Sequence, residues 1–149
     1  MKILKLFIFI LTCFLLTGCP EGDYKRIFIF ENSSSNDVLV YLGGISREYG
    51  GCLYPDTLLP DSEAGIIFPP GVVRGYAFNA VPDADTLCLF IVDKAIVDTT
   101  PWKKIHDENI ILKRYDIAIT DFVRLNWEIT YPPNEAMKNI KMFPAYGEN

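Results

Sequence analysis

Cysteine thiols and one imidazole are the most reactive side chains in this sequence, whose 149 residues contain four Cys and a single His. Cys52 and Cys88 are the two cysteines beyond the apolar N-terminal segment. Outside the cytoplasm such a pair predicts a disulfide, which would add about 4 kcal/mol of stability in the chain-entropy model. Two separate buried thiols are the alternative, because free Cys packs as a small hydrophobe. A metal pair is disfavoured, since there is no CxxC motif and His106 is the only imidazole.

Cys19 has a different chemistry, because it follows Leu16, Thr17 and Gly18 at the end of an apolar run. The run begins after Lys5, has the length of a signal-peptide core, and is too short to span a bilayer. Small residues followed by Cys resemble the lipobox of bacterial lipoproteins, in which the thiol takes a diacylglycerol and the chain is cut before the Cys. Cys19 is therefore expected to carry acyl chains such as palmitate, which hold a protein on a membrane. An ordinary secretory signal with a chance Cys is the alternative.

These features predict a signal peptide at residues 1–18, a tether at 19–23 and one domain at 24–149. Without residues 1–18 the chain has 131 residues, with 12 basic and 19 acidic side chains, so its net charge falls from −5 to −7. Such an acidic domain is a poor match for nucleic acid, whose phosphates select basic faces. The expected location is the cell envelope, as a lipoprotein of the cell outer membrane, on either its periplasmic or its surface side.

Catalysis has little support in the remaining residues. His106 is the only imidazole base, and it lies at a charged helix end where a solvated imidazole is expected. No serine stands in a Gly-x-Ser-x-Gly motif, and no glycine-rich loop is suited to phosphate. Asp83 and Asp85 are interpreted as turn caps beside Pro82 rather than as cation ligands. We expect no catalytic residue, no metal and no cofactor, with a small hydrolase as the least favoured alternative.

The elements that would position these residues are short strands separated by turns. The run 86–92 is apolar on both faces, which predicts a central strand buried on both sides. The first two strands are expected to pair as a hairpin with a long loop. Strands are predicted at 25–30, 38–42, 57–59, 66–68, 72–78, 86–92, 111–119 and 127–131.

Two short helices interrupt this pattern. One is predicted from Thr100 to about Asn109, with Thr100 as its cap, and the other at 120–126 with Thr120 as its cap. The tail from residue 134 carries apolar residues and is expected to pack on the domain. The fold class is therefore all-β, an antiparallel β-sandwich (Ig-like, that is, immunoglobulin-like) with one or two short helical inserts. A small closed barrel is the alternative.

Eight aromatic residues are candidates for a sugar-stacking or protein-binding patch, although each is better explained as a core or cross-strand residue. They are Tyr24, Tyr41, Tyr49, Tyr54, Tyr76, Trp102, Trp127 and Tyr146.

Two pieces of the C-terminal half, the RYD of Arg114–Asp116 and the NWEITYPP of Asn126–Pro133, carry a family resemblance. Over about the last 60 residues the chain resembles small uncharacterised envelope lipoproteins of Bacteroidales-type bacteria. The resemblance implies an envelope lipoprotein and brings no catalytic residue with it. It also implies glycosylation of Asp-Thr-aliphatic sites, a pattern that Thr57 and Thr86 match.

The function expected from the sequence is a lipid-anchored binding or interaction module of the cell envelope. It would present a loop end or a sheet face to a protein or glycan ligand, without catalytic activity. The alternative is a structural or accessory subunit of an envelope complex that uses a sheet edge or the tail at 134–149.

Overall fold

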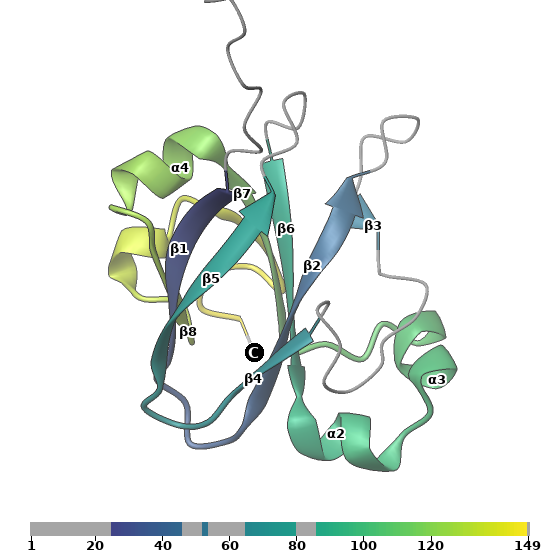
Figure 1. Cartoon of the computed structure of the whole chain (residues 1–149). Helices are drawn as coiled ribbons and strands as arrows, with labels where there is room; N and C mark the ends of the chain where they lie inside the picture. The colour runs from purple at the N-terminus through teal and green to yellow at the C-terminus, as the bar shows by residue number, and fades with distance from the viewer. Residues whose placement is uncertain (1–24, 46–51, 54–64, 80–85, 149) are drawn as a thin grey trace, which may run out of the picture.

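The computed structural model describes residues 25–45, 52–53, 65–79 and 86–148, and it confirms an all-β chain with a few short helices (Figure 1). The strands are β1 (Lys25–Asn32), β2 (Val38–Ile45), β3 (Cys52–Leu53), β4 (Gly65–Phe68), β5 (Val73–Asn79), β6 (Thr86–Asp93), β7 (Lys113–Ala118), β8 (Glu128–Tyr131) and β9 (Lys141–Phe143). The helices are α2 (Lys94–Thr99), α3 (Trp102–Asp107), α4 (Ile119–Arg124) and the 3₁₀ turn η1 (Glu135–Met137).

The smaller sheet has three strands in the order β5-β1-β8. β1 is antiparallel to β5 but parallel to β8, so this sheet is mixed and not antiparallel throughout as the sequence predicted. The expected β1–β2 hairpin is also wrong, because β2 belongs to the other sheet. The polar segment after Asn32 crosses from one sheet to the other instead of turning the chain back on itself.

Asn32 fixes this crossing from inside the protein. Its amide nitrogen donates to the carbonyl oxygens of Phe68 at 2.7 Å and Asn36 at 2.8 Å. Its side-chain oxygen accepts from the backbone nitrogen of Ser34 at 3.0 Å and from the Ser34 hydroxyl at 2.7 Å. Because Asn32 is fully buried, these bonds replace the water that its amide loses on folding.

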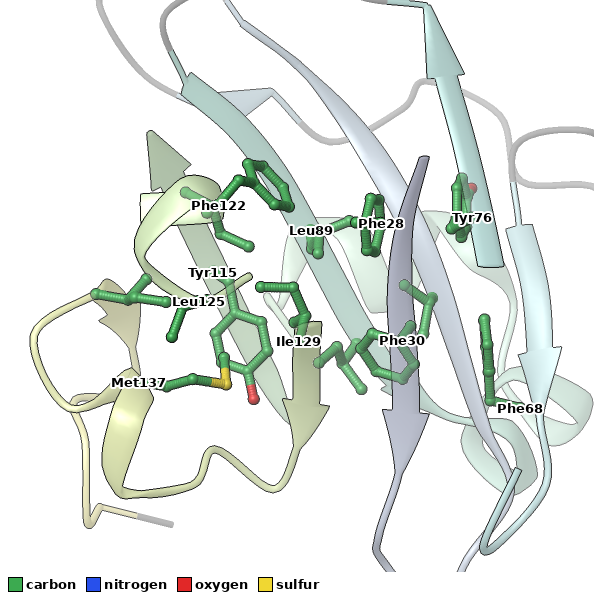
Figure 2. Packing of buried hydrophobic residues seen from close by; sticks show 14 of the residues in the cluster. Phe28, Phe30, Phe68, Tyr76, Leu89, Tyr115, Phe122, Leu125, Ile129 and Met137 are labelled. Carbon is green, nitrogen blue, oxygen red and sulfur yellow. The ribbon is translucent and has the colours of Figure 1, made fainter. Parts of the chain in front are cut away.

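The larger sheet has six strands, ordered β3-β2-β6-β7-β9 with β4 also paired to β2, and all of its pairs are antiparallel. The larger sheet, the smaller sheet and α4 enclose the main core, into which Phe28 and Phe30 of β1 project (Figure 2). Side chains of β6 alternate between this core, at Leu89 and Ile91, and a second apolar cluster, at Cys88 and Phe90. The prediction of a central strand buried on both faces is therefore confirmed.

The segment 94–111 packs on the side of the larger sheet that points away from the main core. There Ile105 and Trp102 of α3 pack on Tyr41 and Phe90. α2 was not predicted, and Thr100 lies at its C-terminal end instead of capping α3. The prediction for Thr120 was also wrong. Thr120 lies within α4, and it is the Asp121 carboxylate that accepts from the Ala118 backbone nitrogen, at 3.2 Å.

The C-terminal tail packs on the domain as predicted. Met137 and Ile140 are buried in the main core, and β9 adds a strand to the edge of β7. The buried ammonium of Lys113 donates to the carbonyl oxygens of Pro144 at 3.2 Å, Ala145 at 3.4 Å and Glu148 at 2.7 Å. A cation from the sheet therefore holds the last turn of the tail in place.

Candidate functional site

The outer face of the three-stranded sheet is the most unusual surface of the described chain. β1 alternates strictly, with Phe28 and Phe30 fully buried while Ile27 and Ile29 are 60% and 41% exposed. On β5, Val73 is 60% exposed and belongs to the same side of the sheet, since it pairs with Glu31. We use the name outer face for the surface made by Ile27, Ile29 and Val73, a row of aliphatic side chains in water.

Gly75 keeps this row open. It pairs with Ile29 in the ladder between β1 and β5, so a side chain at this position would stand on the outer face. A Cβ atom added there would lie 3.3 Å from the Cγ2 atom of Ile27, which is a tight contact. The missing side chain leaves the two isoleucines uncovered by their neighbouring strand.

Trp127 borders the outer face where β8 begins. Its backbone nitrogen donates to the Phe122 carbonyl at 2.8 Å, and its own carbonyl accepts from the Ile29 nitrogen, also at 2.8 Å. The residue has a positive φ of 62°, a conformation that costs a bulky residue about 1–3 kcal/mol and that the surrounding bonds maintain. The indole stacks on Phe122 with ring centroids 5.3 Å apart, so α4 and β8 together fix its position.

A hollow of about 270 Å³ lies beside this indole, lined by Arg26, Ile27 and Trp127. The guanidinium carbon of Arg26 stands 6.0 Å from the centre of the Trp127 ring, at the outer limit of a cation–π contact. The hollow therefore combines an indole, an aliphatic side chain and a guanidinium group.

Arg26 and Arg74 differ from the other described cations in having no carboxylate partner among the described residues. Both belong to the three-stranded sheet, where Arg26 lies near one end of β1 and Arg74 pairs with Phe30 near the other. Carboxylates pair with the remaining lysine and arginine side chains that the structure describes, apart from Lys113, which donates to carbonyls; the side chain of Lys25 is not among those described. These paired side chains are Lys94, Lys103, Lys104, Arg114, Arg124, Lys138 and Lys141. The register places both arginines on the Phe28 and Phe30 side of the sheet, opposite the aliphatic row, since Arg26 alternates with Ile27 and Arg74 pairs with Phe30.

Two carboxylates also lie along the outer face. Glu31 pairs with Val73 and accepts a 2.9 Å hydrogen bond from the Ser33 hydroxyl, and Glu128 pairs with Ile29 and is exposed. The outer face therefore combines the aliphatic row with two carboxylates, whereas Arg26 and Arg74 belong to the opposite side of the sheet.

The residues predicted from sequence are not brought together at this site. Cys88 is buried in β6 and takes part in a disulfide. The backbone of Cys52 forms β3, but its side chain lies outside the described residues, so the pairing of Cys52 with Cys88 stays a prediction. Cys19 and Thr57 also lie outside the described residues, and Thr86 is half-buried at the start of β6.

His106 is exposed on α3, with its Nδ1 atom 3.1 Å from the Asp107 carboxylate, which Lys103 also contacts. These contacts lower the pKa of Asp107, with the Lys103 hydrogen bond as the largest cause. The arrangement is a row of surface charges along one short helix. Within the described ranges no three His, Cys, Asp or Glu side chains gather as a metal site would require.

The most perturbed titratable groups are structural ones. Burial raises the pKa of Tyr41 and of Tyr76 to about 12 each, and burial raises that of Tyr115 further. Burial also lowers the pKa of Lys113, whose ammonium holds the tail. None of these groups borders the hollow beside Trp127.

A second hollow, of about 350 Å³, lies between the β1–β2 connection and the start of α2. Its polar lining is engaged within the protein, since Asp93 accepts from the Ala95 nitrogen at 2.8 Å and Lys94 pairs with Asp98 at 2.6 Å. The Asn36 amide also donates to Asp93, at 3.4 Å. The polar side chains that line this hollow are therefore already used in a helix cap, an ion pair and a hydrogen bond within the protein.

The candidate aromatic patch is not formed as a group. Tyr41 and Tyr76 are buried, Trp102 packs in the second cluster, and Tyr24, Tyr49 and Tyr54 lie outside the described residues. Trp127 packs against the main core and lines the hollow that Ile27 also lines, and Tyr146 is exposed in the tail, where its hydroxyl donates to the Glu135 carboxylate at 3.2 Å. Sequence reasoning missed the aliphatic row because Lys25–Asn32 is apolar at both alternating sets of positions, which does not indicate an uncovered side.

None of the helices in the described part of the chain has the length and apolar character needed to cross a membrane. Comparisons of the chain with protein-family models, curated proteins and solved structures found no match. What the outer face does therefore has to be inferred from its own chemistry.

Proposed function

We propose that this chain is a lipid-anchored interaction module of the cell envelope, without catalytic activity, and that the outer face is its contact surface. The observation that carries this proposal is the exposed aliphatic row of Ile27, Ile29 and Val73 on one side of the three-stranded sheet. Aliphatic side chains in contiguous exposed rows typically mark interaction surfaces.

The domain is proposed to be an immunoglobulin-like sandwich, supported by two sheets that enclose a shared core. Its envelope location is supported by the lipobox-like Leu16–Cys19 and by the resemblance to Bacteroidales-type lipoproteins. A glycan ligand is less well supported than an apolar partner, because Phe122 stacks on the Trp127 indole and Arg26 stands over its ring. A sugar ring would have to displace Arg26 to stack there.

The alternative of an accessory subunit that docks through its tail has a specific observation against it. Met137 and Ile140 are buried in their own domain, and Lys113 holds the carbonyls of residues 144, 145 and 148. A subunit role would therefore use a sheet edge or the outer face instead of the tail.

Two experiments test the anchor and the contact surface separately. Cys19→Ser should move the protein from the membrane fraction to the soluble fraction of lysed cells, and continued membrane retention would rule out anchoring through Cys19. For the surface, a photo-crosslinking amino acid at position 27 should form adducts in living cells. The same probe at position 96 on α2 should form far fewer, since Ile96 is exposed on the helical side. Equal adduct yields at both positions would contradict the role of the outer face.

A further inference from the structure

We propose that two copies of this chain pair through the free edge of β5, so that their three-stranded sheets become one continuous sheet. The partner is therefore a second copy of the same protein. This inference goes beyond the proposed function, because the pairing uses backbone groups at a sheet edge and leaves the outer face uncovered. It rests on the lipid anchor only for the local concentration of the two copies.

β5 forms one edge of the three-stranded sheet, and β1 is the only described strand that pairs with it (Figure 1). The Asn32 nitrogen of β1 donates to the Val72 carbonyl at 3.1 Å, so the even-numbered residues of β1 turn their backbone groups toward β5. Their partners in the register are the even-numbered residues of β5. The backbone groups of Val73 and Gly75 therefore point away from β1, and both residues are exposed, without a backbone hydrogen bond to another described residue.

The other edges of the described sheets are closed or short. At the opposite edge of the same sheet, the Thr130 nitrogen donates to the Met137 sulfur at 3.4 Å, and the Thr130 carbonyl accepts from the Tyr115 hydroxyl at 3.0 Å. β3 has two residues, β4 has four and precedes two prolines, and β9 has three and precedes Pro144. Proteins commonly protect edge strands in these ways. β5 has seven residues, with neither proline nor lysine, and is thus the edge left available.

The sequence of β5 suits antiparallel pairing with itself. In the register centred on Tyr76, all seven residues are paired, and the free backbone groups of Val73 and Gly75 meet positions 79 and 77 of the second copy. Arg74, the only charged residue of the strand, stands opposite position 78, so the two arginines are about 13 Å apart along the sheet. A register centred on Arg74 would place like charges directly opposite each other, which is destabilising.

The carboxylates of the outer face favour this edge over a face-to-face contact between copies. Stacking two outer faces on each other would bury Glu31 and Glu128 of both copies, with no described cation on that face to pair with them. Edge pairing keeps these carboxylates in water. It also places Gly75 at the junction, so that the aliphatic rows of the two copies continue into one surface.

The edge alone is a small contact. Seven residues on each side are well below the roughly 20–30 residues that a stable interface uses, so the dimer is expected to be weak in dilute solution. The anchor changes this, because the six residue steps from Cys19 to Lys25 hold β1 within about 20 Å of the acylated residue. Copies on one membrane thus hold their β5 edges at a similar height and at a raised effective concentration.

Paired cysteines test this register. In the full lipidated chain, Val73→Cys/Asn79→Cys places a thiol of each copy opposite a thiol of the other. Within one copy the two positions are about 20 Å apart, which is too far for a disulfide. Cells that express the variant are oxidised mildly with copper phenanthroline, and their fractions are run on a non-reducing gel. We expect a dimer band at least about tenfold stronger than for Val123→Cys, whose valine on α4 is 65% exposed against 60% for Val73.

Gly75 supplies a matched pair of variants in the same cysteine background. Gly75→Pro removes an edge N–H that the ladder with β1 does not use, and it should lower the dimer yield about tenfold. Gly75→Ala keeps this N–H and adds the Cβ atom that lies 3.3 Å from Ile27, so the yield should stay within about twofold. Thermal unfolding shows whether each variant is folded, and an unfolded Gly75→Pro variant leaves the decision to the cysteine pair.

The outcomes separate the pairing from the anchor. A dimer that Gly75→Pro abolishes and Gly75→Ala keeps would support pairing through β5, whereas a dimer that survives in folded Gly75→Pro would place the contact elsewhere. A dimer no stronger than for Val123→Cys would overturn the pairing, and an adduct of another mass would show that a different protein occupies the edge. The dimer is measured in whichever fraction holds the protein, so a soluble protein would contradict anchoring through Cys19 and still test the edge.

Discussion

Replacing Asn32 with alanine should destabilise the domain by about 2–4 kcal/mol. The side chain makes four hydrogen bonds at 2.7–3.0 Å and is fully buried. A net hydrogen bond contributes about 1 kcal/mol, but Ser34 and Asn36 lie near the surface and can exchange their bonds for water. The carbonyl of Phe68 is the exception, since its bond from Asn32 is buried and its loss costs about 1–3 kcal/mol.

Urea unfolding followed by tryptophan fluorescence measures this difference, with thermal unfolding as a second assay. For a domain of this size the melting temperature should fall by roughly 10 °C. Asn139→Ala is the matched control, because Asn139 is exposed, and it should change stability by no more than about 0.5 kcal/mol. An Asn32→Ala variant as stable as this control would refute the reasoning that a buried amide holds the two sheets together.

Three further predictions follow from the core, its tyrosines and the tail. Phe28→Ala should cost about 3–5 kcal/mol in urea unfolding while Ile27→Ala costs under about 1 kcal/mol, and similar losses would contradict the assignment of the two faces of β1. Tyr41 and Tyr76 have pKa values raised to about 12, so their protonated forms favour the folded state. The free energy of unfolding should fall between pH 10 and 12, by about 2–3 kcal/mol per tyrosine. Replacing either residue with Phe should reduce this pH dependence of the free energy of unfolding. An unchanged pH dependence would contradict the raised pKa of the tyrosine that was replaced. Lys113→Met should speed hydrogen exchange at residues 144–148 about tenfold, and unchanged protection would show that the ammonium does not hold the tail.

Several strands could be predicted because their signal is local. The run 86–92 is apolar at every position, and only a strand covered on both sides can bury it, as β6 is. Pairing is not a local property. β1 and β2 follow each other with a polar turn between them, yet they enter different sheets, and β8 pairs with β1 from about 100 residues away.

The helix boundaries, like strand pairing, depend on contacts that the local sequence does not show. Thr100 and Thr120 have the side chains of helix caps, but the observed helices begin elsewhere. The cap of α4 is Ala118, two residues before the predicted cap, and the carboxylate of Asp121 accepts from the backbone nitrogen of Ala118. A local preference of about 1 kcal/mol is easily overridden by the packing of Phe122 in the core.

By itself the sequence determined the strand-rich class, the central buried strand and the packing of the tail, because alternation and apolar runs are properties of neighbouring residues. Only the tertiary structure decided that one side of β1 stays in water. Ile27 and Phe28 are both apolar, and nothing local distinguishes them. The larger sheet and α4 cover Phe28, while no described segment covers Ile27, so the difference arises from how distant segments are placed.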